Sequence, residues 1–267
     1  MNTRITRQPR NASDRRSAIL QQAQQHGRVA VADLSRRLGV SEVSIRRDLE
    51  YLHDKGLLRR THGGAEALPR AAQGLTPFDP RLLQRAEIKQ AIGRRAARLI
   101  RPGEVVLLDS GTSVLAVACQ LASVLPEGGL TVVTRSLSIA AELPYRRHVR
   151  LIVLGGVYQP EFDTFVGASA EAALKEMHVN RLFIGTDGVT IERGLTTDNL
   201  LEAGLFRVMA ERADHVIVVA DSSKIGVDNL QAVLPLRQVN TFVTDRDAPT
   251  RFVATLRERG VDMLQPV

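Results

Sequence analysis

The sequence has a single cysteine and no long apolar run. Cys119 has no second cysteine with which to form a disulfide inside the chain, so we expect it to be a small apolar filler on a helix. No stretch approaches the roughly 20 apolar residues that cross a bilayer, and the N-terminus lacks the apolar core of a secretory signal. We therefore expect a globular, cytoplasmic protein that has no membrane partner.

Signatures of metals and nucleotide cofactors are also missing. The histidines show no metal-ligand spacing, and a structural zinc cluster would lack thiolate ligands. Neither the G-x-G-x-x-G fingerprint nor the G-x-x-x-x-G-K loop that precedes Ser or Thr occurs in the chain. We expect no metal and no cofactor.

Excess positive charge is confined to the N-terminal part of the chain. Residues 1–70 hold 14 Lys and Arg against 7 Asp and Glu, whereas residues 71–267 hold 22 of each, which together make the totals of 36 and 29. This asymmetry favours a polyanion-binding module joined to a neutral body. A solvated basic surface is the alternative.

The stretch from Ser41 to Ala65 is the most informative part of this basic module. Ile45, Leu49 and Leu52 recur at helical spacing and predict one buried helix face. The opposite face carries Val43, Arg46, Arg47 and Glu50. Ser41 can cap the start of this helix, and Gly56 after Lys55 can end it.

The neighbouring segments complete a recognisable layout. Upstream lie a helix from Asp14 to about His26, an extended piece at Arg28 to Val31, a short helix at Ala32 to Leu38 and a turn at Gly39 and Val40. Downstream, Leu57 to Arg60 and Ala65 to Leu68 flank a four-residue turn and predict a β-hairpin. This order predicts a winged helix-turn-helix domain.

Four regions follow from these patterns. We expect a disordered basic tail at 1–12, the winged helix-turn-helix at 13–68, a proline-punctuated linker at 69–80 and an α/β domain at 81–267.

The last region opens with helical periodicity from Arg81 to Ile100. Short apolar runs then alternate with helical segments, and these runs are Val105 to Leu108, Leu130 to Thr134, Arg150 to Leu154, Arg181 to Gly185, His215 to Ala220 and Thr241 to Thr244. Uninterrupted runs of this kind are typical of buried parallel strands. The fold class expected for this domain is a doubly wound α/β sheet, mainly parallel.

Several side chains of the basic module suit DNA. Arginines can donate two hydrogen bonds to guanine edges or phosphates, and the hairpin can meet phosphate or the minor groove. The expected DNA contacts are Ser41, Val43, Ser44, Arg46, Arg47, Arg59, Arg60 and His62. The alternative for Arg46 is a pairing with Asp48 or Glu50 on an ordinary surface helix.

The residues Ser41 to Leu49, with Ile-Arg-Arg-Asp-Leu, and the turn His62-Gly63-Gly64-Ala65 closely resemble the DeoR family of bacterial transcriptional regulators. The resemblance continues to about Asp245. It implies double-stranded operator DNA as a partner, a phosphorylated sugar as effector and a homo-oligomer, dimer or tetramer. Ser44 stands where the family usually has threonine, which keeps the hydroxyl and loses a methyl that could contact thymine.

In the α/β domain, polar residues follow predicted strands. The segment Asp109 to Ser113 opens a helix, where backbone N–H groups and hydroxyls can bind an anion, and Lys224 can add positive charge. The resemblance implies that Gly111, Thr112, Ser113 and Lys224 hold the phosphate in a domain similar in fold to ribose-5-phosphate isomerase. Arg135 replaces the asparagine usual in the family, which indicates either an altered ligand or a surface charge.

Ligands of open α/β sheets lie at the carboxyl ends of strands, where Tyr158 and Asp198 are also expected. The complete expected effector set is Asp109, Ser110, Gly111, Thr112, Ser113, Ser136, Gly155, Gly156, Asp187, Glu202 and Lys224.

Two functions fit these features. The first is a ligand-responsive repressor of a carbohydrate-utilisation operon, without enzymatic activity. The second is a sugar-phosphate isomerase or lyase with an accessory nucleic-acid domain, for which Asp109, Asp187 and Glu202 are candidate bases. The N-terminal module favours the first, and residues 185–188 lack the second, closely spaced acid of the isomerases.

Overall fold

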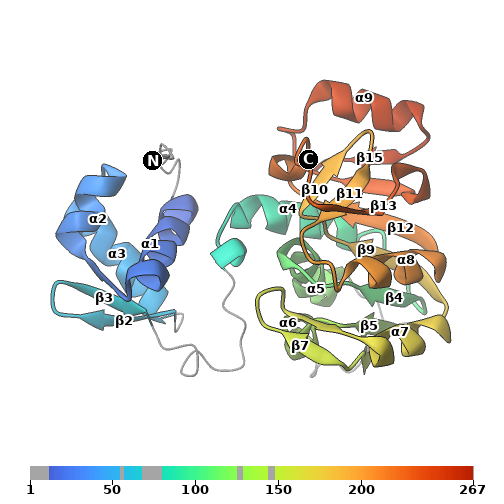
Figure 1. The fold of residues 1–267 in the computed structure, drawn as a ribbon, viewed down its shortest axis with the longest axis horizontal. Coiled ribbons are helices and arrows are strands. Elements are labelled where there is room, and N and C mark those ends of the chain that lie inside the picture. Colours follow the sequence, from blue (N-terminus) through green and yellow to red (C-terminus); the bar gives the residue numbers. More distant parts are fainter. Residues whose placement is uncertain (1–11, 55–56, 68–79, 125–128, 144–147, 267) are drawn as a thin grey trace. The chain divides into compact units, whose positions relative to one another are not determined.

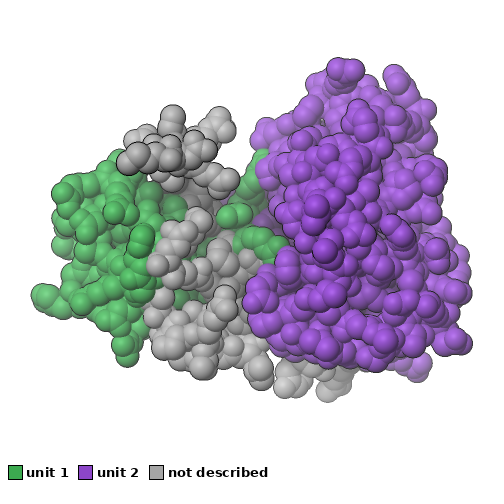
Figure 2. Space-filling view, viewed as in Figure 1, with its two compact units in different colours: residues 1–86 green, residues 87–267 purple. Residues whose placement is uncertain are grey.

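The computed structural model describes residues 12–54, 57–67, 80–124, 129–143 and 148–266. The chain divides into two compact units, residues 1–86 and 87–267, which Figure 2 colours separately. Most of the expected tail and linker, and the expected helix end at Lys55 and Gly56, lie outside the described residues.

The first unit is a winged helix-turn-helix, which confirms the prediction. Its elements are α1 (Ala12–His26), β1 (Arg28–Ala30), α2 (Val31–Leu38), α3 (Glu42–Asp54), β2 (Leu58–Thr61) and β3 (Gly64–Ala67), followed by the short helix η2 (Pro80–Leu82) (Figure 1). The three strands form one antiparallel sheet in the order β1-β3-β2. On α3, Ile45, Leu49 and Leu52 are fully buried, as the helical spacing predicts.

The wing depends on two adjacent glycines. Thr61 pairs with Gly64, so the turn consists of His62 and Gly63 alone and is shorter than the four-residue turn that the sequence indicated. Gly63 has a φ of 80°, which favours glycine. A Cβ on Gly64 would lie 2.0 Å from the carbonyl oxygen of Val29, so only glycine lets β3 approach β1 this closely. The wing is thereby fixed to the helical part of the unit.

The second unit is built on a seven-stranded sheet in the order β15-β14-β12-β9-β4-β5-β6, in which every neighbouring pair is parallel. The strands are β4 (Val105–Leu108), β5 (Leu130–Thr134), β6 (Val149–Val153), β9 (Val179–Ile184), β12 (Ala213–Val219), β14 (Thr241–Val243) and β15 (Asp262–Leu264). Six of them were expected, with boundaries that differ by at most two residues. The sequence analysis missed β15, because three residues give too short a pattern.

Helices cover both faces of this sheet. One core joins it to α4 (Ala86–Ala97), α5 (Thr112–Val124) and α6 (Leu137–Glu142), and the other joins it to α7 (Ala168–Lys175), α8 (Ala203–Glu211) and α9 (Thr250–Glu258). Along β4, Leu107 belongs to the second core while Val106 and Leu108 belong to the first. This doubly wound arrangement confirms the expected fold class. Cys119 lies on α5 but is exposed, so the expectation of an apolar filler was wrong.

Two antiparallel additions were not expected. They are the hairpin of β7 (Val157–Gln159) and β8 (Thr164–Val166), and the sheet of β10 (Gly188–Thr190), β11 (Gly194–Thr197) and β13 (Gln231–Leu234). The short helices η3 (Ser222–Lys224) and η4 (Leu236–Gln238) complete the unit. Each of these additional strands has only three or four residues, too few for a recognisable alternation.

The strand order reverses between β4 and β9. From β4 the chain proceeds through β5 and β6 in one direction, and from β9 through β12, β14 and β15 in the other. In sheets of this type the crevice at such a reversal, beside the carboxyl ends of the strands, is the usual ligand position. The segments that follow β4, β5 and β9 therefore lie at or beside the usual ligand position of this fold.

A helical glycine allows α4 to approach α5. A Cβ on Gly93 would lie 2.4 Å from the carbonyl oxygen of Ala116, a backbone atom that cannot move aside independently. We expect Gly93→Ala to reduce the free energy of unfolding by about 2 kcal/mol, because the two helices would have to separate. Chemical denaturation followed by circular dichroism measures this change.

Gly204→Ala is the matched control, because a Cβ there meets nothing within 4 Å on α8. This variant should be neutral or slightly stabilising. Equal destabilisation of both variants would contradict the close-packing argument.

Candidate functional site

The exposed face of α3 is the first part of the candidate site. Val43, Arg46, Arg47 and Glu50 are all exposed, as the helical spacing predicts. Arg47 has no hydrogen bond or ion pair with any described residue, so its guanidinium is available to a partner. Arg46 contacts the Glu42 carboxylate at 3.0 Å, and not Asp48 or Glu50 as the alternative interpretation proposed. Exposed pairs of this kind are weak and can exchange for phosphate.

Ser41 and Ser44 lie together at the start of α3. The Ser44 backbone N–H donates to the Ser41 hydroxyl over 3.3 Å, and the two hydroxyls are 3.0 Å apart. Ser41 therefore caps the helix, as expected, and Ser44 remains partly exposed at its first turn.

Asp48 anchors α3 to α1. Its side chain is only 2% exposed, and its two carboxylate oxygens accept from Nε of Arg15 at 2.5 Å and Nε of Arg16 at 2.9 Å. The Arg16 guanidinium also lies 3.8 Å from the centre of the Tyr51 ring. The acid inside the Ile-Arg-Arg-Asp-Leu sequence thus fixes α3 to α1 and is itself shielded from solvent.

On the wing, the three expected contacts differ. Arg59 bonds Glu66 at 2.7 Å, and this hydrogen bond lowers the pKa of the Glu66 carboxyl. Arg60 and His62 are exposed and have no partner among the described residues. They are the wing side chains most available to a polyanion.

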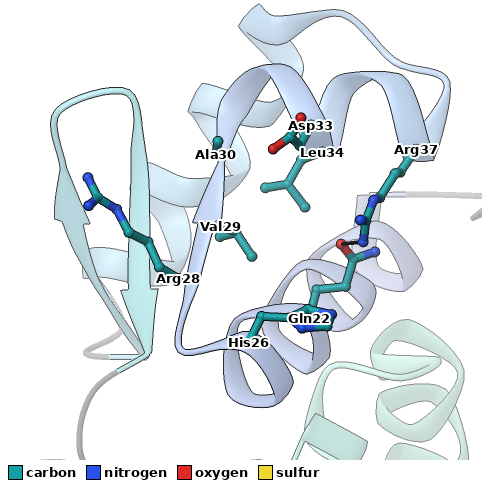
Figure 3. Close-up of a pocket in the computed structure, with 8 residues that line it drawn as sticks. All are labelled: Gln22, His26, Arg28, Val29, Ala30, Asp33, Leu34 and Arg37. Atoms are coloured by element: carbon teal, nitrogen blue, oxygen red, sulfur yellow. Dashed lines mark hydrogen bonds between the residues drawn. The ribbon is translucent and has the colours of Figure 1, made fainter.

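A basic hollow lies beside these elements. It measures about 140 Å³ and is formed by α1, β1 and α2, and the residues in Figure 3 are Gln22, His26, Arg28, Val29, Ala30, Asp33, Leu34 and Arg37. Arg37 reaches Gln22 over 3.5 Å. None of these residues was expected to contact DNA, so positive charge in this unit extends beyond α3 and the wing.

The second part of the candidate site is centred on Arg135, the residue after β5. Its side chain has no exposed surface. Nε donates to Asp109 at 2.6 Å, while Nη1 contacts Glu202 at 3.0 Å and Thr164 at 2.6 Å. The suggestion that Arg135 is a surface charge was therefore wrong.

Charge around Arg135 is dominated by carboxylates. The Ser110 hydroxyl also donates to Glu202, over 3.4 Å. Burial is the main cause that raises the pKa of Glu202; Asp109 and Asp187 raise it further, and Arg135 opposes them. Asp187 in turn accepts a hydrogen bond of 2.8 Å from Thr197. The site therefore brings together Asp109, Ser110, Asp187 and Glu202 from the expected set.

The expected phosphate loop has a suitable backbone. Gly111 has a φ of 105° and precedes Thr112, the first residue of α5. The first N–H groups of a helix have no partner within it and favour anions. Lys224 is half-buried in η3 after β12, and no ion pair or hydrogen bond joins its ammonium to a described residue. Strand β9 separates β4 from β12, which sets their ends roughly 10 Å apart.

Ser136 is already engaged by the fold. Its hydroxyl caps α6 by accepting from the Ile139 N–H and donates to Asp163 at 2.6 Å. Asp163 also accepts from the Ser138 N–H at 3.1 Å and from the Tyr158 hydroxyl at 3.0 Å. These bonds tie the β7–β8 hairpin to the start of α6. Asp163, which has a φ of 52°, was not among the residues expected from the sequence analysis.

The remaining expected residues, Asp198, Gly155 and Gly156, have local structural roles or are exposed. Asp198 accepts from the Leu230 N–H at 3.0 Å and orders a loop. Gly155 is exposed, and a Cβ on Gly156 would lie 2.4 Å from the Val166 carbonyl oxygen, so only glycine at 156 lets the chain pass this close to the β7–β8 hairpin.

Within the described ranges no three His, Cys, Asp or Glu residues are grouped to hold a metal ion. No helix in those ranges is long and apolar enough to cross a membrane.

Fold and surface together define a class of protein: a sequence-specific DNA-binding regulator with a winged helix-turn-helix and a separate α/β sensor. The DeoR-like helix-turn-helix domain matches residues 15–70, and the DeoR C terminal sensor domain matches residues 84–246. The chain belongs to the DeoR family of transcriptional regulators.

Named relatives cover nearly the whole chain. A protein named for repression of the aga operon in Escherichia coli O157:H7 is 33% identical over 94% of this chain and 93% of its own. The transcriptional repressor GlcR of Bacillus subtilis is 34% identical over 94% and 95%. An L-fucose operon activator of Haemophilus influenzae is 32% identical over 86% and 91%.

Among solved structures, ribose 5-phosphate isomerase A from Methanocaldococcus jannaschii aligns with a TM-score of 0.39 at 17% identity. The alignment covers 52% of this chain and 54% of the isomerase. This likeness concerns the fold alone.

Proposed function

We propose that this protein represses a carbohydrate-utilisation operon in the cytoplasm and leaves its operator when a phosphorylated sugar binds the α/β unit. The observation that supports the proposal is that one chain has two features. An exposed Arg47 lies on α3, whose opposite face is buried, and a buried polar cluster around Arg135, formed with Asp109, Thr164 and Glu202, lies where the strand order reverses. Repression is favoured over activation because two of the three relatives described above are named as repressors.

Binding without turnover is part of the proposal. Proton abstraction from a sugar needs a carboxylate free to accept the proton. Two of the three candidate bases, Asp109 and Glu202, are ion-paired with the same buried guanidinium. Incubation with ribose 5-phosphate should leave its NMR spectrum unchanged, and appearance of the ketose would favour the isomerase alternative.

The effector can alter DNA affinity only if it binds the free and DNA-bound arrangements differently. We propose that the protein acts as a dimer or tetramer assembled mainly through its α/β units. The operator should then contain two copies of a half-site, arranged as an inverted or direct repeat. Footprinting that found one unrepeated half-site bound by a monomer would contradict this arrangement.

The effector itself can be found with the full chain. A thermal-shift screen of sugar phosphates and their unphosphorylated sugars should show melting temperatures raised by the phosphorylated members only. A binder should also release a promoter fragment in a gel-shift assay. If no sugar phosphate shifts the melting temperature or the DNA complex, the proposed effector class is wrong.

We expect Lys224→Ala to leave operator affinity unchanged and to remove the effector response. The half-buried ammonium has no described partner, so its loss costs the free protein little while a bound phosphate loses its opposing charge. We expect the effector affinity to fall at least tenfold, the range for a charge-assisted hydrogen bond. Titration of the effector against a labelled operator complex measures both quantities.

Lys175→Ala is the control for Lys224→Ala, because Lys175 lies in an exposed pair with Glu171 on α7. It should behave as the wild type in both measurements. A Lys224→Ala protein that is released normally would exclude Lys224 as the phosphate partner.

A further inference from the structure

Among the residues that the structure describes, Arg135 is the one large charged side chain that is fully buried beside the expected effector residues. A guanidinium carries five N–H donors in a rigid plane. Here Nε bonds Asp109, and Nη1 serves both Thr164 and Glu202. Nη2 is buried and has no acceptor among the described residues. The side chain is thus satisfied on two of its three nitrogens.

An unsatisfied Nη2 is unfavourable in the free protein, because a buried donor loses water and gains no bond. Any ligand that places a hydrogen-bond acceptor beside Nη2 would remove this unfavourable free energy. Such an acceptor would lie next to groups from three separate segments, namely Asp109 directly after β4, Thr164 in β8 and Glu202 directly before α8. The unpartnered nitrogen therefore belongs to the polar cluster and points to a ligand atom there.

The charges indicate what kind of acceptor fits. Asp109 and Glu202 already place two negative charges on one guanidinium, and Asp187 lies close enough to act on Glu202. A further anion would face three carboxylates with a single arginine between them. A neutral oxygen avoids that repulsion, and a hydroxyl can also donate its own proton to a carboxylate.

We propose that Arg135 is a specificity-determining residue of the effector site, whose Nη2 donates to a neutral oxygen, hydroxyl or carbonyl, on the sugar part of the effector. The inference rests on the proposed sugar-phosphate effector and adds that different residues bind its phosphate and its sugar. The phosphate is held by residues 111–113 with Lys224, and Arg135 contacts the sugar end of the molecule. Arginine in place of the asparagine usual in the family therefore narrows the set of sugars that bind.

The test compares Arg135→Met with the wild-type full chain by titration calorimetry. The probes are inorganic phosphate, ribose 5-phosphate, 2-deoxyribose 5-phosphate, fructose 6-phosphate and glucose 6-phosphate. For the sugar phosphate that the wild type binds most tightly, we expect Arg135→Met to lose at least tenfold in affinity. The affinity for inorganic phosphate should change less than threefold. Arg150→Met, on the exposed side of β6, is the matched control and should bind all probes as the wild type does.

Arg135→Lys provides a second variant, because it keeps the buried positive charge for Asp109 and Glu202 without the planar fork. It should remain folded and bind the sugar phosphates in a different order of affinity. If Arg135→Met does not fold, the order of affinities measured for Arg135→Lys tests the role proposed for Arg135. An unchanged order in Arg135→Lys, or equal losses for phosphate and sugar phosphate in Arg135→Met, would overturn the role given to Arg135. If the wild type binds inorganic phosphate but no sugar phosphate, or none of the probes, the proposed effector is wrong and the role of Arg135 falls with it.

Discussion

Asp48→Ala is expected to destabilise the DNA-binding unit more than a substitution at any exposed position of that unit does. The change leaves Arg15 and Arg16 facing the space of a buried carboxylate, with side chains only 17% and 26% exposed. Removal of one partner from a buried ion pair costs about 3 to 5 kcal/mol. Because both arginines retain some water, we expect about 3 kcal/mol, the lower end of that range.

Hydrogen exchange resolves this effect in a protein of two units. Amides of α3 should lose protection in Asp48→Ala, while those of β4 and β9 keep it. Asp33→Ala is the control, since Asp33 forms an exposed pair with Arg36 and should cost less than about 1 kcal/mol. Normal protection of α3 in Asp48→Ala would show that the two ion pairs contribute little.

The second large effect concerns DNA. Arg47→Ala should lower affinity for the operator by about 1 to 3 kcal/mol, the worth of a bidentate base contact, and should leave binding to unrelated DNA almost unchanged. The reason is that Arg47 is exposed on α3 and has no partner in the described parts of the chain. Fluorescence anisotropy with a selected operator and a scrambled duplex gives both affinities.

Arg60→Ala should behave differently. Arg60 lies on the wing and is expected to contact phosphate. Its loss should therefore lower the affinity for both duplexes equally and reduce the slope of log affinity against log salt concentration by about one. Arg150→Ala, in the α/β unit, controls for the change in net charge. The reverse pattern, with specificity lost in Arg60→Ala and retained in Arg47→Ala, would mean that helix and wing have exchanged roles.

Local periodicity made much of the fold predictable. The spacing of Ile45, Leu49 and Leu52 defined the buried face of α3, and the uninterrupted apolar runs marked six buried parallel strands. In both cases the apolar pattern and the helix or strand that it predicts lie within the same few consecutive residues. The seventh strand and the antiparallel additions were missed, because each of these strands has only three or four residues and their pairing depends on distant segments.

The candidate site was less accessible to prediction. Arg135 follows a buried strand and could equally have pointed into water, because its acceptors are 26, 29 and 67 positions away in the chain. Asp48 presents the same difficulty, with partners 33 and 32 positions upstream. Long-range ion pairs leave no periodic trace, so a sequence reveals their members and not their pairing.

The contact between Gly64 and Val29 has a consequence for the evolution of operators. Since β3 is bonded to β1 and Gly63 accepts from the Val31 N–H at 2.9 Å, the wing cannot slide relative to α3. In the DNA-binding mode proposed above, the interval along the duplex between the bases that α3 contacts and the phosphates that the wing contacts is therefore constant. In that mode, substitutions at Val43, Ser44 or Arg47 can match base changes within a half-site, but no single substitution can compensate for a base pair inserted between the two contacts.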